Sequence, residues 1–178
     1  MKKIRSAAVI LASAVMMSVM TGCAQGLYEI YQKETVPKDW YDGTLDYLKS
    51  GFESDWTNVS EDTSVPYIYK DKNIKFGYLL KDLDGDGAEE LLVGLMDGSE
   101  ETKFTNLYVW HSDFGAINNM STDDENFMYL YDNNVIRMDT TIGKTTRSEF
   151  MEYDHKSNSY HIVDPVEGKP GKYTLTAF

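Results

Sequence analysis

Residues 76–94 read FGYLLKDLDGDGAEELLVG and place an acidic loop between two apolar segments. The flanking segments, Phe76–Leu80 and Leu91–Val93, are short and rich in aliphatic and aromatic side chains, which predicts strands rather than helices. The loop between them is rich in Gly and Asp, and both residue types tolerate tight turns. This stretch therefore predicts a β-hairpin, and the rest of the chain is interpreted around it.

The loop of this hairpin also predicts a metal site. Carboxylates at every second position would direct their oxygens to one point, and Gly87 permits the sharp turn that follows. Oxygen ligands without sulfur or imidazole favour Ca²⁺ among common cations, and we expect a structural ion. An acidic, solvated turn without a metal is the alternative, although converging carboxylates would then repel one another. The predicted ligands are Asp82, Asp84, Asp86, the backbone carbonyl of Ala88, and Glu90.

Two known calcium loops resemble this stretch. The first part matches an EF-hand loop, but position 12 is Val93, where an EF-hand has a bidentate Glu. Phe76–Gly94 resembles the FG-GAP/VCBS-type calcium repeat of integrin α-chains and many bacterial surface proteins, with Glu90 in place of the usual Asp. The resemblance implies a calcium-binding hairpin. It covers 19 residues and has no second copy in the chain, so a full propeller of such repeats is not expected.

The chain begins with the pattern of an export signal. Basic residues come first, and an apolar run follows from Ala7 to Met20, which is shorter than the roughly 20 residues of a membrane-spanning helix. We therefore expect residues 1–22 to be a signal peptide. The basic residues are Lys2, Lys3 and Arg5.

The end of this segment, Met20-Thr21-Gly22-Cys23, resembles the lipobox of bacterial lipoproteins. The resemblance implies that Cys23 is lipidated, becomes the mature N-terminus, and attaches the protein to the extracytoplasmic face of the cell membrane. A diacylglyceryl group supplies the two acyl chains that stable anchoring needs. The alternative is a spare thiol behind an ordinary signal peptide.

Residues 23–37 are interpreted as a tether and residues 38–178 as a single globular domain. A helix is expected from Lys38 to Phe52, because apolar residues recur there at helical spacing. Short segments of period two follow, which predicts an α+β fold: an N-terminal helix, then a mostly antiparallel sheet of β-hairpins. The expected strands are Lys75–Leu83, Glu90–Met96, Asn106–His111, Asn126–Tyr131, Val135–Asp139, Ser148–Tyr153 and Tyr160–Val163, with Tyr173–Phe178 as a further candidate.

Composition excludes some functions. The 178 residues include 17 Lys and Arg against 29 Asp and Glu, a formal net charge of −12, and the expected leader carries basic but no acidic residues. This acidity argues against nucleic-acid binding, which needs a cationic surface. The single Cys excludes a disulfide framework.

The expected function is a non-catalytic binding or envelope-associated role, with a glycan or protein as possible ligand. An extracellular hydrolase or accessory subunit acting on glycans or peptidoglycan is the alternative, and an inhibitor or partner subunit of another exported protein comes third. Three histidines without zinc-site spacing, His111, His155 and His161, are interpreted as surface residues. The strand aromatics would form a stacking platform if exposed, but core packing is the expectation for most of them. They are Tyr108, Trp110, Phe127, Tyr129, Tyr131, Tyr153 and Tyr160.

Overall fold

The computed structural model describes residues 39–57, 66–111, 115–122, 126–154, 157 and 159–178. These residues belong to one compact unit, Val36–Phe178. The expected signal peptide, Cys23 and the tether lie outside the described residues. Within the described part of the chain, no helix is both long and apolar enough to cross a membrane.

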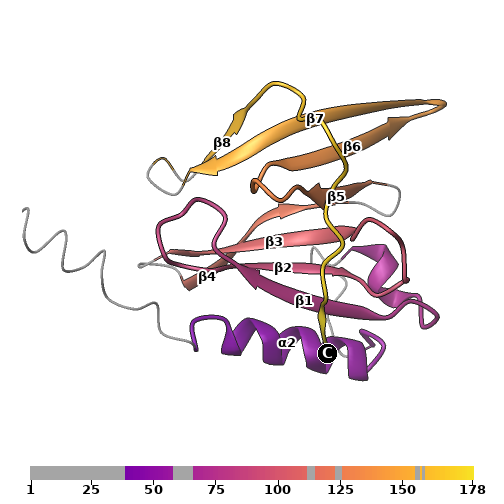
Figure 1. Ribbon diagram of the computed structural model, residues 1–178. Coiled ribbons are helices and arrows are strands. Elements are labelled where there is room, and N and C mark those ends of the chain that lie inside the picture. Colours follow the sequence, from indigo (N-terminus) through magenta and orange to yellow (C-terminus); the bar gives the residue numbers. More distant parts are fainter. Residues whose placement is uncertain (1–38, 58–65, 112–114, 123–125, 155–156, 158) are drawn as a thin grey trace, which may run out of the picture. The chain divides into compact units, whose positions relative to one another are not determined.

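The described residues form one open antiparallel sheet of nine strands together with the helix α2 (Asp42–Glu53) and a short 3-10 turn, η1 (Tyr67–Lys70) (Figure 1). The α+β class, with most of its structure in the sheet, is thereby confirmed. The strands are β1 (Phe76–Lys81), β2 (Glu90–Leu95), β3 (Phe104–His111), β4 (Gly115–Ser121), β5 (Phe127–Leu130), β6 (Ile136–Ile142), β7 (Thr145–Asp154), β8 (Ser159–Ile162) and β9 (Thr176–Ala177).

The sheet divides at β3. Its strand order is β8-β7-β6-β5-β3-β2-β1-β9, and β4 also pairs with β3. Residues 106–111 of β3 pair with β4, whereas Phe104 pairs with Met128 of β5. The strands β5–β8 therefore leave the plane of β1–β4, and they lie above it in Figure 1. This division produces an inner face on which the two parts of the sheet enclose side chains.

Two hydrophobic clusters lie on opposite faces of β1–β3. Leu92 belongs to the first and its neighbour Val93 to the second, as expected for a strand whose side chains alternate between faces. The first, which we call the inner core, joins β1–β3 to β5–β8, and its central residue Phe104 is fully buried. The second, the helix-side core, contains Leu48 of α2, Trp56 and Phe76.

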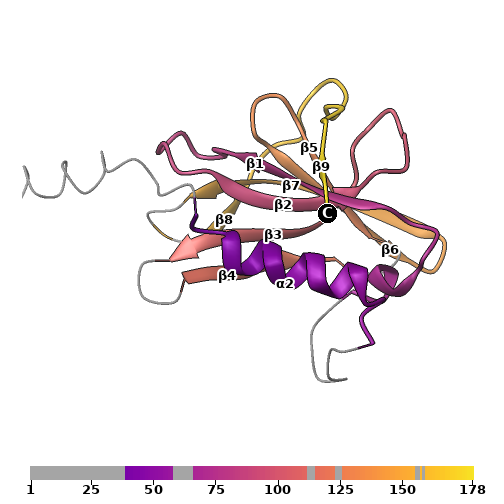
Figure 2. The same cartoon turned by 90° about the horizontal axis from the view of Figure 1, so that it is seen from below.

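The helix α2 covers the outer face of the sheet (Figure 2). It begins at Asp42, not at Lys38, but its apolar stripe is confirmed: Leu48 is 1% exposed, and Phe52 stacks on Phe76 at a ring distance of 4.9 Å. The helix ends at Glu53, and three residues later Trp56 adopts a positive φ of 57° and its ring covers Gly51. A Cβ at Gly51 would lie 2.5 Å from that ring, so only Gly fits there.

Most of the expected strands are present with shifted ends. The turn Asp132-Asn133-Asn134 joins β5 to β6, and Asn134 has a positive φ of 66°, which Asn tolerates better than most residues. Within the segment expected as strand Tyr173–Phe178, only Thr176–Ala177 pairs as a strand, with β1. The strand β4 and the turn η1 were not expected from the sequence.

Candidate metal centre

The acidic loop joins β1 to β2, as predicted. These strands pair in register from Phe76 opposite Leu95 to Lys81 opposite Glu90, so residues 82–89 form the connection. Gly85 and Gly87 take φ values of 78° and 91°, a region that L-residues with side chains rarely adopt. The two glycines thus allow the loop to fold back on itself.

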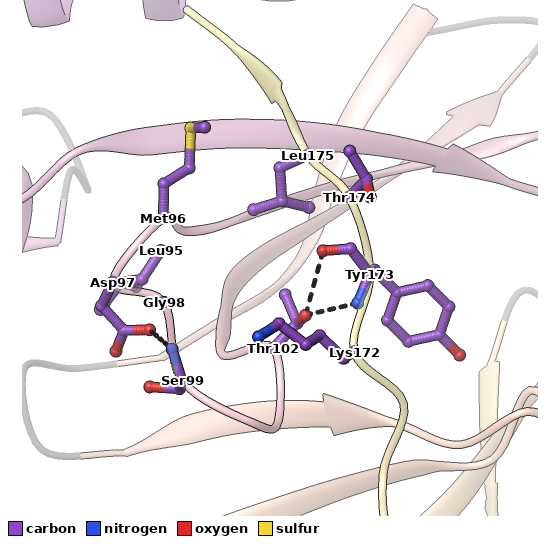
Figure 3. Close-up of a pocket in the computed structure, with 10 residues that line it drawn as sticks. All are labelled: Leu95, Met96, Asp97, Gly98, Ser99, Thr102, Lys172, Tyr173, Thr174 and Leu175. Atoms are coloured by element: carbon purple, nitrogen blue, oxygen red, sulfur yellow. Dashed lines mark hydrogen bonds between the residues drawn. The ribbon is translucent and has the colours of Figure 1, made fainter.

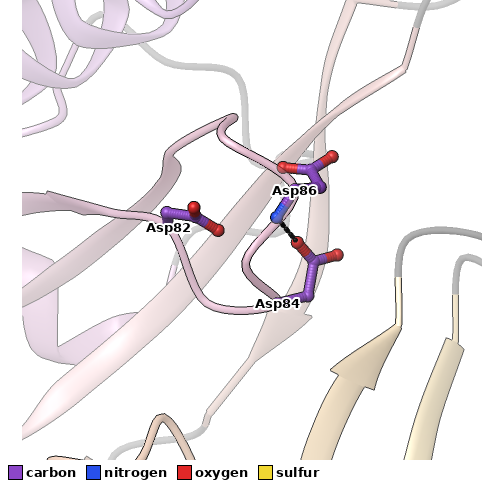
Figure 4. Close-up of side chains that lie close together, drawn as sticks. All are labelled: Asp82, Asp84 and Asp86. Carbon is purple, nitrogen blue, oxygen red and sulfur yellow. Dashed lines mark hydrogen bonds between the residues drawn. The ribbon is translucent and has the colours of Figure 1, made fainter. Parts of the chain in front are cut away.

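Three carboxylates converge inside this loop. One ligand oxygen from each of Asp82, Asp84 and Asp86 lies within 4.8 Å of the others, and all three side chains are partly buried (Figure 4). Calcium binds oxygen at roughly 2.3–2.6 Å, so two ligands of one ion lie at most about 5 Å apart. The spacing of the three oxygens is therefore compatible with a shared Ca²⁺.

Backbone amides orient these carboxylates. Asp82 accepts bonds from the N–H groups of Gly85 at 2.7 Å and Gly87 at 3.0 Å, one on each oxygen. The amide of Asp86 donates to Asp84 at 3.2 Å. Such bonds fix the side-chain rotamers and offset part of the negative charge.

The loop is attached to the rest of the domain at two points. Leu83 is buried in the inner core. The amide Nδ2 of Asn134, in the β5–β6 turn, donates to the backbone carbonyl of Asp82 at 3.0 Å. The position of the first predicted ligand is therefore linked to a turn that lies far away in the sequence.

Glu90 lies apart from the three-carboxylate group. It is 4% exposed, and its Oε2 accepts the backbone N–H of Leu83 at 2.8 Å. Burial raises the pKa of Glu90 to about 8; the bond from Leu83 opposes this shift, and the nearby aspartates, Asp84 first, add to it. Glu90 thus fixes the loop through its hydrogen bond to the backbone of Leu83. Ala88 donates its N–H to Asp86 at 2.6 Å.

The charge of Glu90 acts on several tyrosines, a relationship that the sequence did not predict. Burial and then the negative charge of Glu90 raise the pKa of Tyr153 to about 12, and the pKa of Tyr41 rises for the same two reasons. The hydroxyl of Tyr160, a ring neighbour of Tyr153, is buried and has no hydrogen-bond partner among the described residues. The only sequence signal for this grouping was that Tyr153 and Tyr160 lie on consecutive expected strands; in the structure they are partners across β7 and β8.

A cavity of about 260 Å³ lies elsewhere, between the β2–β3 connection and residues 172–175 (Figure 3). It contains none of the predicted ligands. Its one carboxylate, Asp97, accepts the N–H of Ser99 and pairs with Lys103 at 2.8 Å. The hydrolase alternative would need opposed carboxylates in a cleft, and this cavity does not provide them.

The remaining sequence candidates are dispersed. His161 is exposed and lies 3.4 Å from Asp154, whereas His155 and the side chain of His111 lie outside the described residues. Five of the seven strand aromatics are half-buried, and the other two are buried. The two buried ones are Tyr131, 5% exposed, and Tyr153, 7% exposed.

No protein-family model matches this chain, and no curated protein or solved structure is significantly similar to it. The resemblance to FG-GAP-type repeats therefore rests on the sequence of residues 76–94 alone.

Proposed function

We propose that this protein is a calcium-stabilised lipoprotein, anchored at the extracytoplasmic face of the cell membrane, with a non-catalytic binding or envelope-associated role. The observation that carries the proposal is the convergence of Asp82, Asp84 and Asp86 on one point of a β-hairpin loop. The lipid anchor rests on the lipobox-like sequence that ends at Cys23.

A structural role for the ion follows from the attachments of the loop. An ion bound to Asp82 would fix the residue whose carbonyl accepts the bond from Asn134. It would thereby strengthen the link between the β1–β2 hairpin and the β5–β6 turn. The three carboxylates are only partly buried, as suits an ion that stabilises a surface loop and is exchanged with the medium.

Isothermal titration calorimetry with CaCl₂ tests this proposal. The intact chain is compared with Asp84→Asn and with Asp97→Asn, a matched control in which another aspartate that accepts a backbone N–H is replaced. We expect saturable binding in the intact chain and in Asp97→Asn, and at least a tenfold loss of affinity in Asp84→Asn. Extracellular calcium modules have dissociation constants of up to about 1 mM. Absence of binding to the intact chain at a tenfold higher calcium concentration, about 10 mM, would contradict the proposal.

The ligand of the binding role is proposed to be a glycan or a protein. A pull-down from the native envelope with and without EDTA, paired with a glycan array, identifies it. Retention that depends on calcium would support a role for the loop in presenting the binding surface.

A further inference from the structure

Residues 171–178, which we call the arm, connect the two hydrophobic clusters. Tyr173 and Leu175 pack against the inner core, and Phe178 packs against the helix-side core. The ring of Phe178 lies 5.0 Å from that of Phe52 and 5.5 Å from that of Tyr78. The arm thus crosses the sheet with its anchoring side chains turned inward, and Figure 1 shows it passing in front of the strands.

The sheet contains a slot for one of these side chains. Gly77 and Gly94 face each other in the β1–β2 pair, and together they leave the inner face bare of side chains. Leu175 fills this space: a Cβ at Gly77 would lie 2.9 Å from Leu175, and one at Gly94 would lie 3.2 Å from it. Both glycines belong to the repeat-like stretch Phe76–Gly94, and together they accommodate the arm.

Hydrogen bonds hold the arm along its length. The N–H of Gly171 donates to the carbonyl of Leu130 at 2.8 Å, and the N–H of Tyr173 donates to Oγ1 of Thr102 at 2.7 Å. Thr176 then pairs with Tyr78 of β1. Anchors, slot and backbone bonds make up a complete binding site for one extended segment.

Residues 163–170, which we call the hinge, join this arm to β8. They contain no helix or strand, and most of them are exposed. Pro165 and Pro170 stiffen the two ends, since proline fixes φ. Between them Gly168 makes the bend with a φ of 103°, a value that glycine tolerates and other residues do not. Extension at Gly168 would therefore carry the arm away from its own sheet.

We propose that the arm is exchanged between two copies of this chain, so that the arm of each copy fills the Gly77–Gly94 slot of the other. The arm of a second copy fits the slot because it presents the same anchoring side chains at the same spacing. Every arm contact of the single chain is remade in the exchanged pair. The free energies of the two forms therefore differ only through the hinge conformation and the entropy of association. Eight hinge residues reach at most about 26–29 Å when extended, enough to cross to a neighbouring sheet.

Disulfide trapping tests the exchange directly. In a Cys23→Ser background, one purified protein carries Tyr78→Cys and a second, mass-tagged protein carries Thr176→Cys. These positions are register partners, and strand pairs at this separation accept a disulfide. After mixing and mild oxidation well below the melting temperature, we expect a mixed disulfide in at least tenfold excess over that from a Lys81→Cys and Thr176→Cys mixture. Equal yields from both mixtures would overturn the proposal.

Sedimentation of two further variants separates arm exchange from an ordinary surface contact. Gly168→Ala strains the bent hinge, and extension of the hinge relieves that strain. Each relieved hinge should favour the exchanged form about tenfold, so the two hinges of a dimer should raise the dimerisation constant about 100-fold. Leu175→Ala weakens the same contact in monomer and dimer alike, so the melting temperature should fall while the dimerisation constant stays within about threefold. A constant unchanged in Gly168→Ala, or lost in Leu175→Ala, would overturn the exchange. A dimer trapped by neither cysteine mixture would point to another surface and would overturn it as well.

Discussion

The backbone N–H of Leu83 lies 2.8 Å from Oε2 of Glu90, so the second residue of the acidic loop is bound to the residue that closes it. Both residues are buried. This bond contains no contribution from an ion, and it fixes the separation of the two loop ends. The three carboxylates thus lie between two loop positions that this bond joins.

The first prediction concerns this bond in the presence of EDTA. Glu90→Ala leaves the buried amide of Leu83 without an acceptor and opens a cavity, so we expect a loss of about 2–4 kcal/mol in the free energy of unfolding. Glu90→Gln retains an acceptor oxygen of the same shape and should cost less than about 1 kcal/mol. Urea unfolding followed by tryptophan fluorescence measures both values, and equal losses in the two variants would refute the role assigned to the bond.

The second prediction concerns metal removal. Calcium at about 100 times its dissociation constant should add about 2.7 kcal/mol to the stability of the folded state. For a domain of this size the melting temperature should rise by about 5–10 °C relative to EDTA. Differential scanning calorimetry measures the shift. The shift should vanish in Asp84→Asn and persist in Asp97→Asn, and a melt of the intact chain that EDTA does not change would argue against the ion.

The third prediction concerns the glycine slot. A Cβ at Gly94 would lie 2.7 Å from the backbone carbonyl of Lys103 and close to Leu175, so Gly94→Ala should destabilise the domain by about 1–3 kcal/mol. Gly43→Ala is the matched control, because nothing lies within 4 Å of a Cβ at this helical position. The control should leave stability unchanged or raise it by up to about 1 kcal/mol. Thermal unfolding of the two variants checks the contrast.

The fourth prediction concerns alkaline pH. Burial raises the pKa of Tyr108 to about 12, with a smaller contribution from Tyr47, and burial raises the pKa of Tyr69 well above 10. The folded state keeps these protons above pH 10, whereas the unfolded state loses them. Their contribution to stability is therefore complete below pH 10 and declines as pH rises toward 12. Absorbance at 295 nm should show these tyrosines ionising together with unfolding, and independent ionisation before unfolding would contradict the assignment.

The fifth prediction concerns the anchor. Cys23→Ser removes the thiol that the lipid requires, so the protein should move from the membrane fraction to the soluble fraction after cell disruption. The intact protein should stay in the pellet through a carbonate wash and enter a detergent phase. If Cys23→Ser fractionates like the intact protein, the lipid anchor is wrong.

The hairpins of the fold were predictable because their signals are local. Alternating apolar residues and an Asn-rich turn mark β5 and β6, and the glycines and aspartates of residues 82–87 mark the β1–β2 connection. The strand β4 was not predictable in this way. Residues 115–121 read GAINNMS, without alternation and with two asparagines, and β4 forms because β3 offers it an open edge.

The residues of the candidate site were predictable from the sequence, but the burial of Glu90 and the long-range contacts of the loop were not. The spacing of Asp82, Asp84 and Asp86 was sufficient to bring their oxygens together. Glu90 is buried, and its charge helps to raise the pKa values of Tyr153 of β7 and Tyr160 of β8, although these strands lie far from it in the sequence; no local pattern reports such a relationship. The same holds for Asn134, whose bond to Asp82 exists only in the folded chain.

The pairing of β1 with β9 has a consequence for the speed of folding. Tyr78 and Thr176 are partners although nearly the whole domain separates them in the sequence, and such non-local pairs form slowly. The β1–β2 and β6–β7 hairpins pair residues that are close in the sequence, whereas one edge of β1 is completed only by the distant residues 176–177. Until that pairing forms, the row of unpaired amides and carbonyls on β1 exposes a partly folded chain to aggregation.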